Sequence, residues 1–215
     1  PRVRLKIACS LDGAIAMSDG QSHWITGEQA RDDVQRLRAS SGAVMTGIGT
    51  VLADNPALTV RDATLNRHGR QPLRVVLDSE LRMPLTAEML GLPGKTLLYC
   101  SDRRRAAALE VAGAEVICVA GAHGLVDLAA VLRDLGKREI NDLLVEAGPA
   151  LAGQMLAQGL VDEFIIYQAP HFMGSETLGM FKTPGWSQLV DRQALRIVDR
   201  TELGDDLRIT ALPAN

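Results

Sequence analysis

The residues with the clearest chemical potential lie in the stretch 143–153, Leu-Leu-Val-Glu-Ala-Gly-Pro-Ala-Leu-Ala-Gly. A short apolar run ends at Glu146, and Gly148 followed by Pro149 predicts that a strand leads into a helix. The start of such a helix presents unbonded backbone N–H groups that can hold a phosphate. A carboxylate beside them would repel phosphate unless it has another task, such as accepting hydrogen bonds from a substrate ring. An ordinary strand-to-helix connection with a solvated glutamate fits the same stretch.

Lys6 is a second candidate for chemistry. The alternation from Val3 to Cys9 predicts a strand with one apolar face, and Lys6 shares the other face with Ala8. A lysine in mid-strand indicates an edge position open to water. The turn expected at residues 10–13 would also place Lys6 near a strand end, within reach of a cleft.

Two further side chains have alternative interpretations. Trp24 lies in an expected loop of a chain with 3% aromatic residues, where its ring can stack on a ligand or cover the edge of the core. Arg38 flanks the apolar stripe of a helix for which Thr26 and Gln29 form a capping box. A charge at that border either reaches solvent or points into a site.

A glycine-containing turn follows the predicted strand 43–46. Gly47 and Gly49 allow a ligand to approach the backbone closely, and Thr50 can cap the short helix expected next. The third glycine of the dinucleotide-binding fingerprint is missing, so the turn by itself is weak support for that function. A short strand is expected at residues 58–61, ending in Arg61.

The elements that must position these residues alternate between strand and helix. Apolar strands are expected at 74–78, 96–100, 115–119, 143–146 and 163–169, with helices at 103–112 and 128–135. This order predicts an α/β fold with a mostly parallel central sheet and helices on both faces. Residues 195–200 and 207–212 predict a C-terminal antiparallel hairpin. With no linker or repeat, residues 1–215 are expected to form a single domain.

Composition excludes several classes of function. A net charge of -3 argues against long-range electrostatic attraction to nucleic acid or to a membrane surface. No apolar run approaches the roughly 20 residues of a membrane span. The four histidines lack metal-ligand spacing, so no metal is expected. Cys9, Cys100 and Cys118 are expected to be buried thiols in a reducing compartment, the cytoplasm.

Four segments carry a resemblance to a known family. They are Leu5–Ala8 with the turn at Ser10–Gly13, then Trp24–Thr26, then Gly49–Arg61, and finally Val145–Pro149. In this order they closely resemble the reductase domain of the bifunctional riboflavin-biosynthesis deaminase/reductase family. The likeness covers almost the whole chain, and the run Thr-Val-Leu-Ala-Asp-Asn-Pro-Ala-Leu-Thr-Val-Arg at 50–61 is highly specific.

The resemblance implies a dihydrofolate-reductase-like fold and NADPH-dependent reduction of 5-amino-6-(5-phosphoribosylamino)uracil to the ribitylamino compound, by hydride transfer to ribose C1′. It implies cofactor contacts at Ala8, Trp24, Thr50, Asp54, Ser79, Gly148, Pro149, Ala150, Leu151, Ala152, Gly153 and Gln154. It implies substrate contacts at Lys6, Ser22, Arg38, Leu58, Arg61 and Glu146. The candidates for handling the proton are Lys6, Asp54 and Glu146, with Lys6 expected near the ribose and Glu146 on the pyrimidine.

The family's zinc deaminase domain is expected to be absent, because neither its H-x-E element nor P-C-x-x-C occurs in the sequence. One alternative is a stand-alone reductase of the archaeal and fungal type, which acts on the earlier 2,5-diamino-6-ribosylamino-pyrimidinone 5′-phosphate. A catalytically silent NADP-binding module and a purely structural domain are the others. A homodimer is expected, since the family dimerises through this domain and the end hairpin offers an edge to pair.

Overall fold

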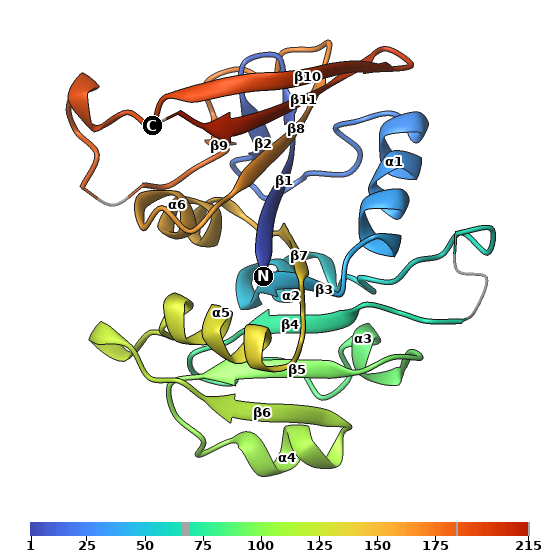
Figure 1. Cartoon of the computed structure of the whole chain (residues 1–215), viewed down its shortest axis with the longest axis vertical. Coiled ribbons are helices and arrows are strands. Elements are labelled where there is room, and N and C mark those ends of the chain that lie inside the picture. Colours follow the sequence, from blue (N-terminus) through green and yellow to red (C-terminus); the bar gives the residue numbers. More distant parts are fainter. Residues whose placement is uncertain (66–68, 184, 215) are drawn as a thin grey trace. The chain divides into compact units, whose positions relative to one another are not determined.

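The chain folds into two compact units. The computed structural model describes residues 1–65, 69–183 and 185–214 (Figure 1). Unit 1 contains Pro1 and Gln35–Leu144, and unit 2 contains Arg2–Val34 and Val145–Asn215. Helix α1 (Glu28–Ala39) and strand β7 (Asp142–Glu146) each carry the chain from one unit into the other. That the whole chain behaves as a single domain stays a prediction.

Unit 1 is built on four parallel strands in the order β3-β4-β5-β6. The strands are β3 (Ala43–Gly47), β4 (Leu73–Leu77), β5 (Thr96–Cys100) and β6 (Ala114–Cys118). The helical segments are α2 (Ile48–Asp54), α3 (Glu88–Gly91), α4 (Ala106–Val111), η1 (Ala122–Gly124) and α5 (Leu128–Lys137). Buried apolar residues on both strand faces require cover on both sides of the sheet.

Helices supply that cover on both faces of the unit 1 sheet. On one face, Val76 and Leu98 pack in a cluster that includes Ile48 of α2 and Leu109 of α4. On the other face, the buried Tyr99 of β5 donates its hydroxyl to Asp134 of α5 at 2.6 Å. The predicted parallel sheet with helices on both faces is therefore confirmed in this unit.

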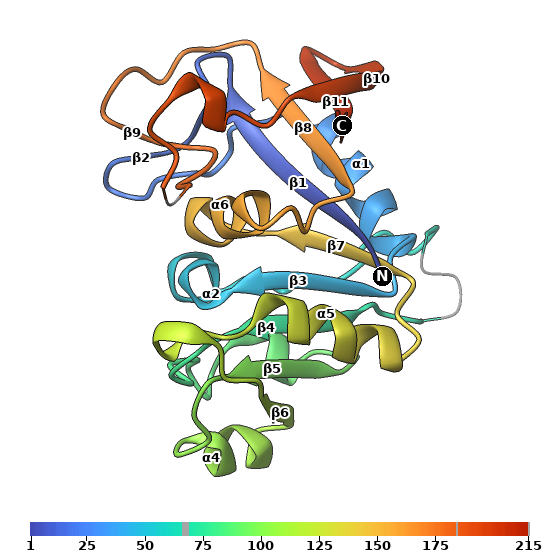
Figure 2. The same cartoon turned by 60° about the vertical axis from the view of Figure 1, so that its left-hand side comes forward.

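Unit 2 has a mixed sheet in the order β10-β11-β8-β1. Its strands are β1 (Arg2–Ser10), β8 (Glu163–Ala169), β10 (Leu195–Leu203) and β11 (Asp206–Pro213), with α6 (Pro149–Ala157) and η2 (Leu189–Asp191) as further elements. β1 and β8 run parallel and lie side by side in both views (Figure 2). β10 and β11 form the predicted antiparallel hairpin, which is confirmed.

The two faces of the unit 2 sheet differ in polarity. The register pairs Leu5 with Phe164, both buried, so one face is apolar. Lys6 lies on the opposite face, because neighbouring residues of a strand point to opposite sides. On that opposite face, Ala8 pairs with Tyr167 and Tyr167 pairs with Arg208. Polar groups therefore gather on the face that carries Lys6.

Several local predictions were wrong. Helix α1 begins at Glu28, so Gly27 and not Thr26 precedes its first turn, and the capping box is not formed. Thr50 lies inside α2, whose N-cap is Gly47. Cys118, at the end of β6, is exposed rather than buried, whereas Cys9 and Cys100 are buried as expected. The paired strands β2 (Ala14–Met17) and β9 (Thr177–Gly179) were not predicted.

The strand expected at residues 58–61 does not form, although its backbone polar groups are satisfied. Gln71 accepts from the Val60 N–H at 2.7 Å through Oε1 and donates to the Val60 carbonyl at 3.0 Å through Nε2. The Arg61 N–H donates to Gln35 Oε1 at 2.7 Å. Side-chain amides replace a neighbouring strand here, so the segment needs no sheet partner.

None of the helices in the described ranges combines the length and the apolar character needed to cross a bilayer.

Arg74 is the largest of the almost fully buried side chains in unit 1, with 1% of its surface exposed. Its guanidinium donates to Thr96 Oγ1 and to the carbonyl oxygens of Leu92, Pro93 and Gly94, at 2.8–3.1 Å. Desolvation lowers the pKa of this guanidinium. All of these acceptors are uncharged. By binding three consecutive carbonyl groups, the Arg74 guanidinium fixes the turn before β5.

We expect Arg74→Met to lower the free energy of unfolding by about 2–4 kcal/mol, because it leaves buried acceptors without a donor. Urea denaturation measures this loss. The control is Arg82→Met, which removes only an exposed ion pair with Glu80 and should cost less than about 1 kcal/mol. An equal effect of the two substitutions would contradict the structural role of Arg74.

Candidate functional site

Lys6 and Glu146 form the central pair of charges in unit 2. Lys6 is in β1, Glu146 is the last residue of β7, and their Nζ and Oε2 atoms are 3.8 Å apart. The side chains are only 18% and 11% exposed. Removing two charges from water costs free energy, and the attraction between the charges does not always offset this cost. A largely buried ion pair whose glutamate is the last residue of a strand is a candidate for ligand binding or proton transfer.

The helix that follows Glu146 begins as predicted. Gly148 is the N-cap with φ -70° and ψ 176°, and Pro149 takes the first helical position. Gly148 has no side chain that could cap the first N–H groups of the helix. The predicted connection from strand to helix is therefore confirmed, and phosphate binding at the start of α6 stays a prediction.

The later part of the predicted cofactor segment has a packing role in the structure. Ala152 and Gly153 are buried within unit 2. A Cβ on Gly153 would lie 2.1 Å from the carbonyl oxygen of Lys182, so only glycine fits there. The Lys182 N–H also donates to the carbonyl of Pro149 at 2.9 Å. Cofactor contacts from Gly148 to Gln154 stay a prediction, and the geometry favours the first turn for them.

Ser22 and Trp24 lie together at a hollow of about 180 Å³ in unit 2. Trp24 is 66% exposed, and the guanidinium carbon of Arg31 lies 4.9 Å from its ring centroid. A ring this exposed can stack on a flat ligand. His171 and Met173 contribute another part of the lining.

Asp12 anchors the Met173 side of this hollow, and sequence reasoning missed it. Its carboxylate accepts from the Ser10 hydroxyl and from the N–H groups of Met173 and Gly174, the last at 2.8 Å. These hydrogen bonds, with the one from Ser10 contributing most, lower the pKa of Asp12 to about 2. The sequence indicated only a turn at 10–13, because two of the Asp12 partners, Met173 and Gly174, lie 161 and 162 positions away.

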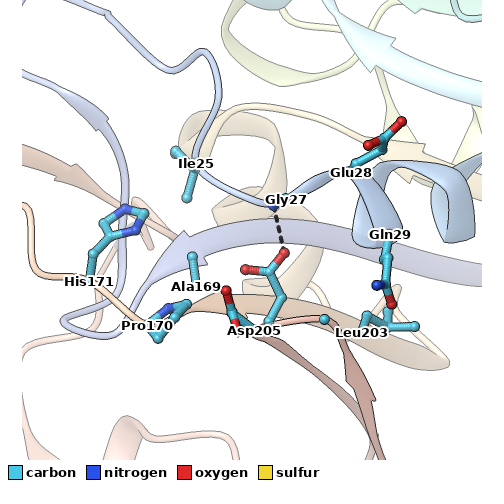
Figure 3. Close-up of a pocket in the computed structure, with 11 residues that line it drawn as sticks. Ile25, Gly27, Glu28, Gln29, Ala169, Pro170, His171, Leu203 and Asp205 are labelled. Atoms are coloured by element: carbon cyan, nitrogen blue, oxygen red, sulfur yellow. Dashed lines mark hydrogen bonds between the residues drawn. The ribbon is translucent and has the colours of Figure 1, made fainter.

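A second hollow of about 360 Å³ lies between the start of α1, the end of β8 and the β10–β11 turn (Figure 3). The Gly27 N–H donates to Asp206 Oδ2 at 2.6 Å across this hollow. Glu28, Asp205 and Asp206 make the lining acidic, which disfavours phosphate. None of the predicted site residues lines it.

In unit 1 the predicted residues follow the strand ends. Thr50 and Asp54 lie in α2, directly after β3, and Leu58 adopts φ 49° in the segment beyond it. Arg38 donates from Nη1 to the carbonyl of Thr59 at 3.1 Å, which joins the end of α1 to the same segment. The highly specific 50–61 run is therefore one continuous structure of helix, turn and extended chain.

Ser79 lies just beyond the end of β4. Its Oγ accepts from the Val126 N–H at 3.2 Å, which leaves its own hydrogen available to a ligand. Its carbonyl accepts from the Ser101 N–H at 3.0 Å. Two neighbouring groups, Thr46 Oγ1 and Asp78 Oδ1, are buried without a hydrogen-bond partner among the residues that the structure describes. Polar groups therefore collect at the carboxyl edge of the unit 1 strands, where α/β sheets bind ligands.

No group of three or more metal-ligating side chains occurs among the described residues. His68, one of the histidines considered above, lies outside them.

Comparison with protein families matches residues 1–209 to the RibD C-terminal domain. The chain belongs to the RibD C-terminal domain family. This confirms the resemblance drawn from the sequence motifs. A solved structure of Acinetobacter baumannii RibD has a TM-score of 0.86 and 37% identity, and it covers 100% of this chain and 58% of that one. The predicted fold class is confirmed with it.

Two relatives of this chain carry different names. The riboflavin biosynthesis protein RibD of Escherichia coli is 39% identical over 216 residues, which cover 96% of this chain. The 2,5-diamino-6-ribosylamino-4(3H)-pyrimidinone 5′-phosphate reductase of Archaeoglobus fulgidus is 40% identical over 182 residues, 81% of this chain and 82% of that protein. The chain spans 58% of the Escherichia coli protein's length.

The Asp12 contacts predict an acid-sensitive element. A carboxylate whose pKa is lower in the folded state than in the unfolded state stabilises the fold. This contribution is complete at pH values above the ordinary pKa of 3.8, and it is lost as the pH falls through about 2. We therefore expect Asp12→Asn to be less stable than the wild type at pH 7. The difference should shrink as the pH falls from 4 toward 2. Urea midpoints measured across this pH range test the expectation, and a difference independent of pH would contradict it.

Proposed function

We propose that the chain catalyses the NADPH-dependent reduction of 5-amino-6-(5-phosphoribosylamino)uracil to its ribitylamino product in riboflavin biosynthesis. The observation that carries the proposal is the largely buried Lys6–Glu146 pair, whose glutamate lies two residues before Gly148, the N-cap of α6. Membership of the RibD C-terminal domain family supports it. We assign only the reductase step to this chain, because the deaminase motifs are missing from its sequence.

The reaction adds a hydride to C1′ and a proton to the nitrogen of the open-chain imine, giving a secondary amine. NADPH supplies the hydride when it is bound. In the proposal, Glu146 accepts hydrogen bonds from the pyrimidine and Lys6 lies near the ribose. Lys6, Asp54 and Glu146 are the candidates for handling the proton. Because Lys6 and Glu146 are largely buried, their interactions with a bound ring are stronger than they would be in water.

The proposed substrate contacts also include Ser22, Arg38, Leu58 and Arg61. Arg38 and Arg61 suit the 5′-phosphate, because guanidinium groups bind phosphate oxygens in pairs. The backbone at both arginines is fixed: Arg38 is in α1, and the Arg61 N–H is held by Gln35. Ser22 lines the same hollow as Trp24.

The donor set of the chain fits NADPH. The first turn of α6, Gly148 to Leu151, offers N–H groups to the pyrophosphate, and Trp24 offers an exposed ring. Ser79 has a hydroxyl hydrogen to donate to the 2′-phosphate that distinguishes NADPH from NADH. The remaining proposed contacts are Ala8, Thr50, Asp54, Ala152, Gly153 and Gln154.

We also propose a homodimer formed through β10, at the edge of the unit 2 sheet. Leu195, Ile197 and Val198 are exposed along this strand. An uncovered strand edge with apolar side chains is suited to pairing with a second copy. A cytoplasmic location belongs to the same proposal and agrees with the free thiols of Cys9, Cys100 and Cys118.

The test of the proposed reaction is NADPH oxidation followed at 340 nm, with the deaminated uracil and its aminated precursor offered in parallel. We expect turnover on the uracil and a much slower rate with NADH. The named substrate of the Archaeoglobus fulgidus relative favours the precursor as a second candidate. Preference for it would change the substrate assignment, whereas NADPH binding without turnover on either compound would indicate a silent binding module and contradict the proposal.

Substitutions in the central pair test the residue roles. Glu146→Gln and Lys6→Met should each lower turnover by at least about tenfold, as expected when a positioned polar group is lost. Arg2→Ala is the control, since Arg2 lies on the same strand and its side chain is 56% exposed. The control should keep activity within about twofold. Near wild-type turnover in both site variants would contradict these roles.

A further inference from the structure

Cys100 and Cys118 are the last residues of the neighbouring strands β5 and β6 in unit 1 (Figure 1). The parallel register places them directly opposite each other, and both thiols are free. Residues paired in this way point to the same face of a sheet, and neighbouring strands lie about 4.8 Å apart. That separation is within the range of Cα distances that a disulfide can join.

The two thiols differ in their access to solvent. Cys100 is fully buried in the apolar cluster of unit 1, whereas Cys118 is exposed on β6, the last strand of the sheet. Burial raises the pKa of Cys100 to about 11, and the charge of Cys118 and a hydrogen bond between the two thiols add to this effect. The hydrogen bond means that the two sulfurs are in contact. An oxidant in solution therefore meets Cys118 first, and Cys100 is placed to react with the sulfur of Cys118.

Arg103 supplies a positive charge beside this pair. Its Nη1 donates to the carbonyl of Val116 at 2.5 Å, which holds the guanidinium near the end of β6. The charge of Arg103 lowers the pKa of Cys100, against the larger effect of burial. The thiolate is the form of cysteine that attacks a disulfide, and a nearby cation stabilises it. The surroundings of the pair therefore favour thiol exchange.

Cys9 has the opposite environment. It is 1% exposed in β1 of unit 2. Burial raises its pKa to about 11, and the charge of Asp12 raises it further. A carboxylate disfavours the thiolate that exchange requires. Cys9 is therefore an internal control for the reactivity of the other two thiols.

Hydrogen bonds connect the pair with Ser79 by two routes. Ser101, which directly follows Cys100, donates its N–H to the Ser79 carbonyl at 3.0 Å. The segment that follows Cys118 includes Val126, whose N–H donates to Ser79 Oγ at 3.2 Å. A shift of the ends of β5 and β6 would therefore reach both the backbone and the hydroxyl of Ser79.

We propose that Cys100 and Cys118 are a dithiol that a small-molecule disulfide converts into an intramolecular disulfide, and that this bond weakens NADPH binding at Ser79. The first part stands on the geometry of unit 1, and the second part rests on the proposed function. The bond requires the two Cβ atoms to approach to about 3.8 Å. This is closer than the spacing of neighbouring strands, so the ends of β5 and β6 must move toward each other.

Oxidised glutathione is a suitable oxidant for this exchange. The Cys118 thiolate attacks one of its sulfurs, the S–S bond of glutathione breaks, and a mixed disulfide and one glutathione thiolate result. The Cys100 thiolate then attacks the Cys118 sulfur and displaces the second glutathione. The two protein thiols lose two electrons, oxidised glutathione gains them, and the two protons pass to the released glutathione thiolates.

The first test counts thiols and does not depend on activity. The reduced protein is treated with oxidised glutathione, unfolded, alkylated with iodoacetamide and digested with trypsin, which cleaves after Arg103, Arg104 and Arg105, between the two cysteines. We expect linked peptides that contain Cys100 and Cys118, and an alkylated Cys9. Three alkylated cysteines, or a glutathione adduct that accumulates on Cys118, would overturn the proposal.

Three variants assign the steps. Cys118→Ser should form no intramolecular bond, and Cys100→Ser should stop at the mixed disulfide on Cys118. Cys9→Ser is the matched control and should form the bond as the wild type does. Cys118 is exposed, so its substitution leaves the core intact if Cys100→Ser fails to fold. A linked Cys9 peptide in the wild type would contradict the assignment.

The second test measures the dissociation constant for NADPH by fluorescence titration of the reduced and the oxidised protein. Oxidation should raise it about three- to tenfold, the range expected when one hydrogen bond is lost, and dithiothreitol should restore it. Cys118→Ser treated with the oxidant should bind NADPH like the reduced wild type. Unchanged affinity in protein that carries the disulfide would overturn the second part. Reduced wild-type protein that fails to bind NADPH would contradict the proposed function, whereas the thiol count would still decide the first part.

Discussion

The candidate site depends on one electrostatic constraint, the desolvation of Lys6 and Glu146. Two opposite charges 3.8 Å apart and largely withdrawn from water need further polar partners to be stable. The unit 2 sheet concentrates polar side chains on the face where Lys6 lies and apolar ones on the other. Strand alternation alone produces this division, because neighbouring residues of β1 point to opposite faces.

The proposed nucleotide contacts lie in the backbone next to this pair. Strand β7 ends at Glu146, and Gly148, which has no capping side chain, is the N-cap of the helix that follows. Gly153 secures that helix, since any side chain there would meet the backbone of Lys182. The glutamate thus has a rigid neighbour that attracts anions, which is a reason to assign it to a substrate ring and not to phosphate.

Much of the fold followed from sequence patterns, whereas the site did not. Strand Glu163–Ala169 was predicted with its observed bounds, because a continuous apolar run has few alternatives. The segment around Val60 was expected to be a strand. Its backbone groups instead form hydrogen bonds with the side-chain amide of Gln71, and hydrophobic periodicity gives no sign of such a contact. Lys6 and Glu146 are 140 positions apart, so their pairing depends on tertiary structure. Their proposed roles came from family resemblance.

The most direct test of the central claim is isotope transfer. NADPH carrying deuterium at both C4 positions of the nicotinamide would be supplied with the aminouracil substrate, and the product would be studied by mass spectrometry and NMR. The account predicts one deuterium at C1′ of the ribityl chain. A reduced product without deuterium at C1′, or NADPH consumption without that product, would contradict it.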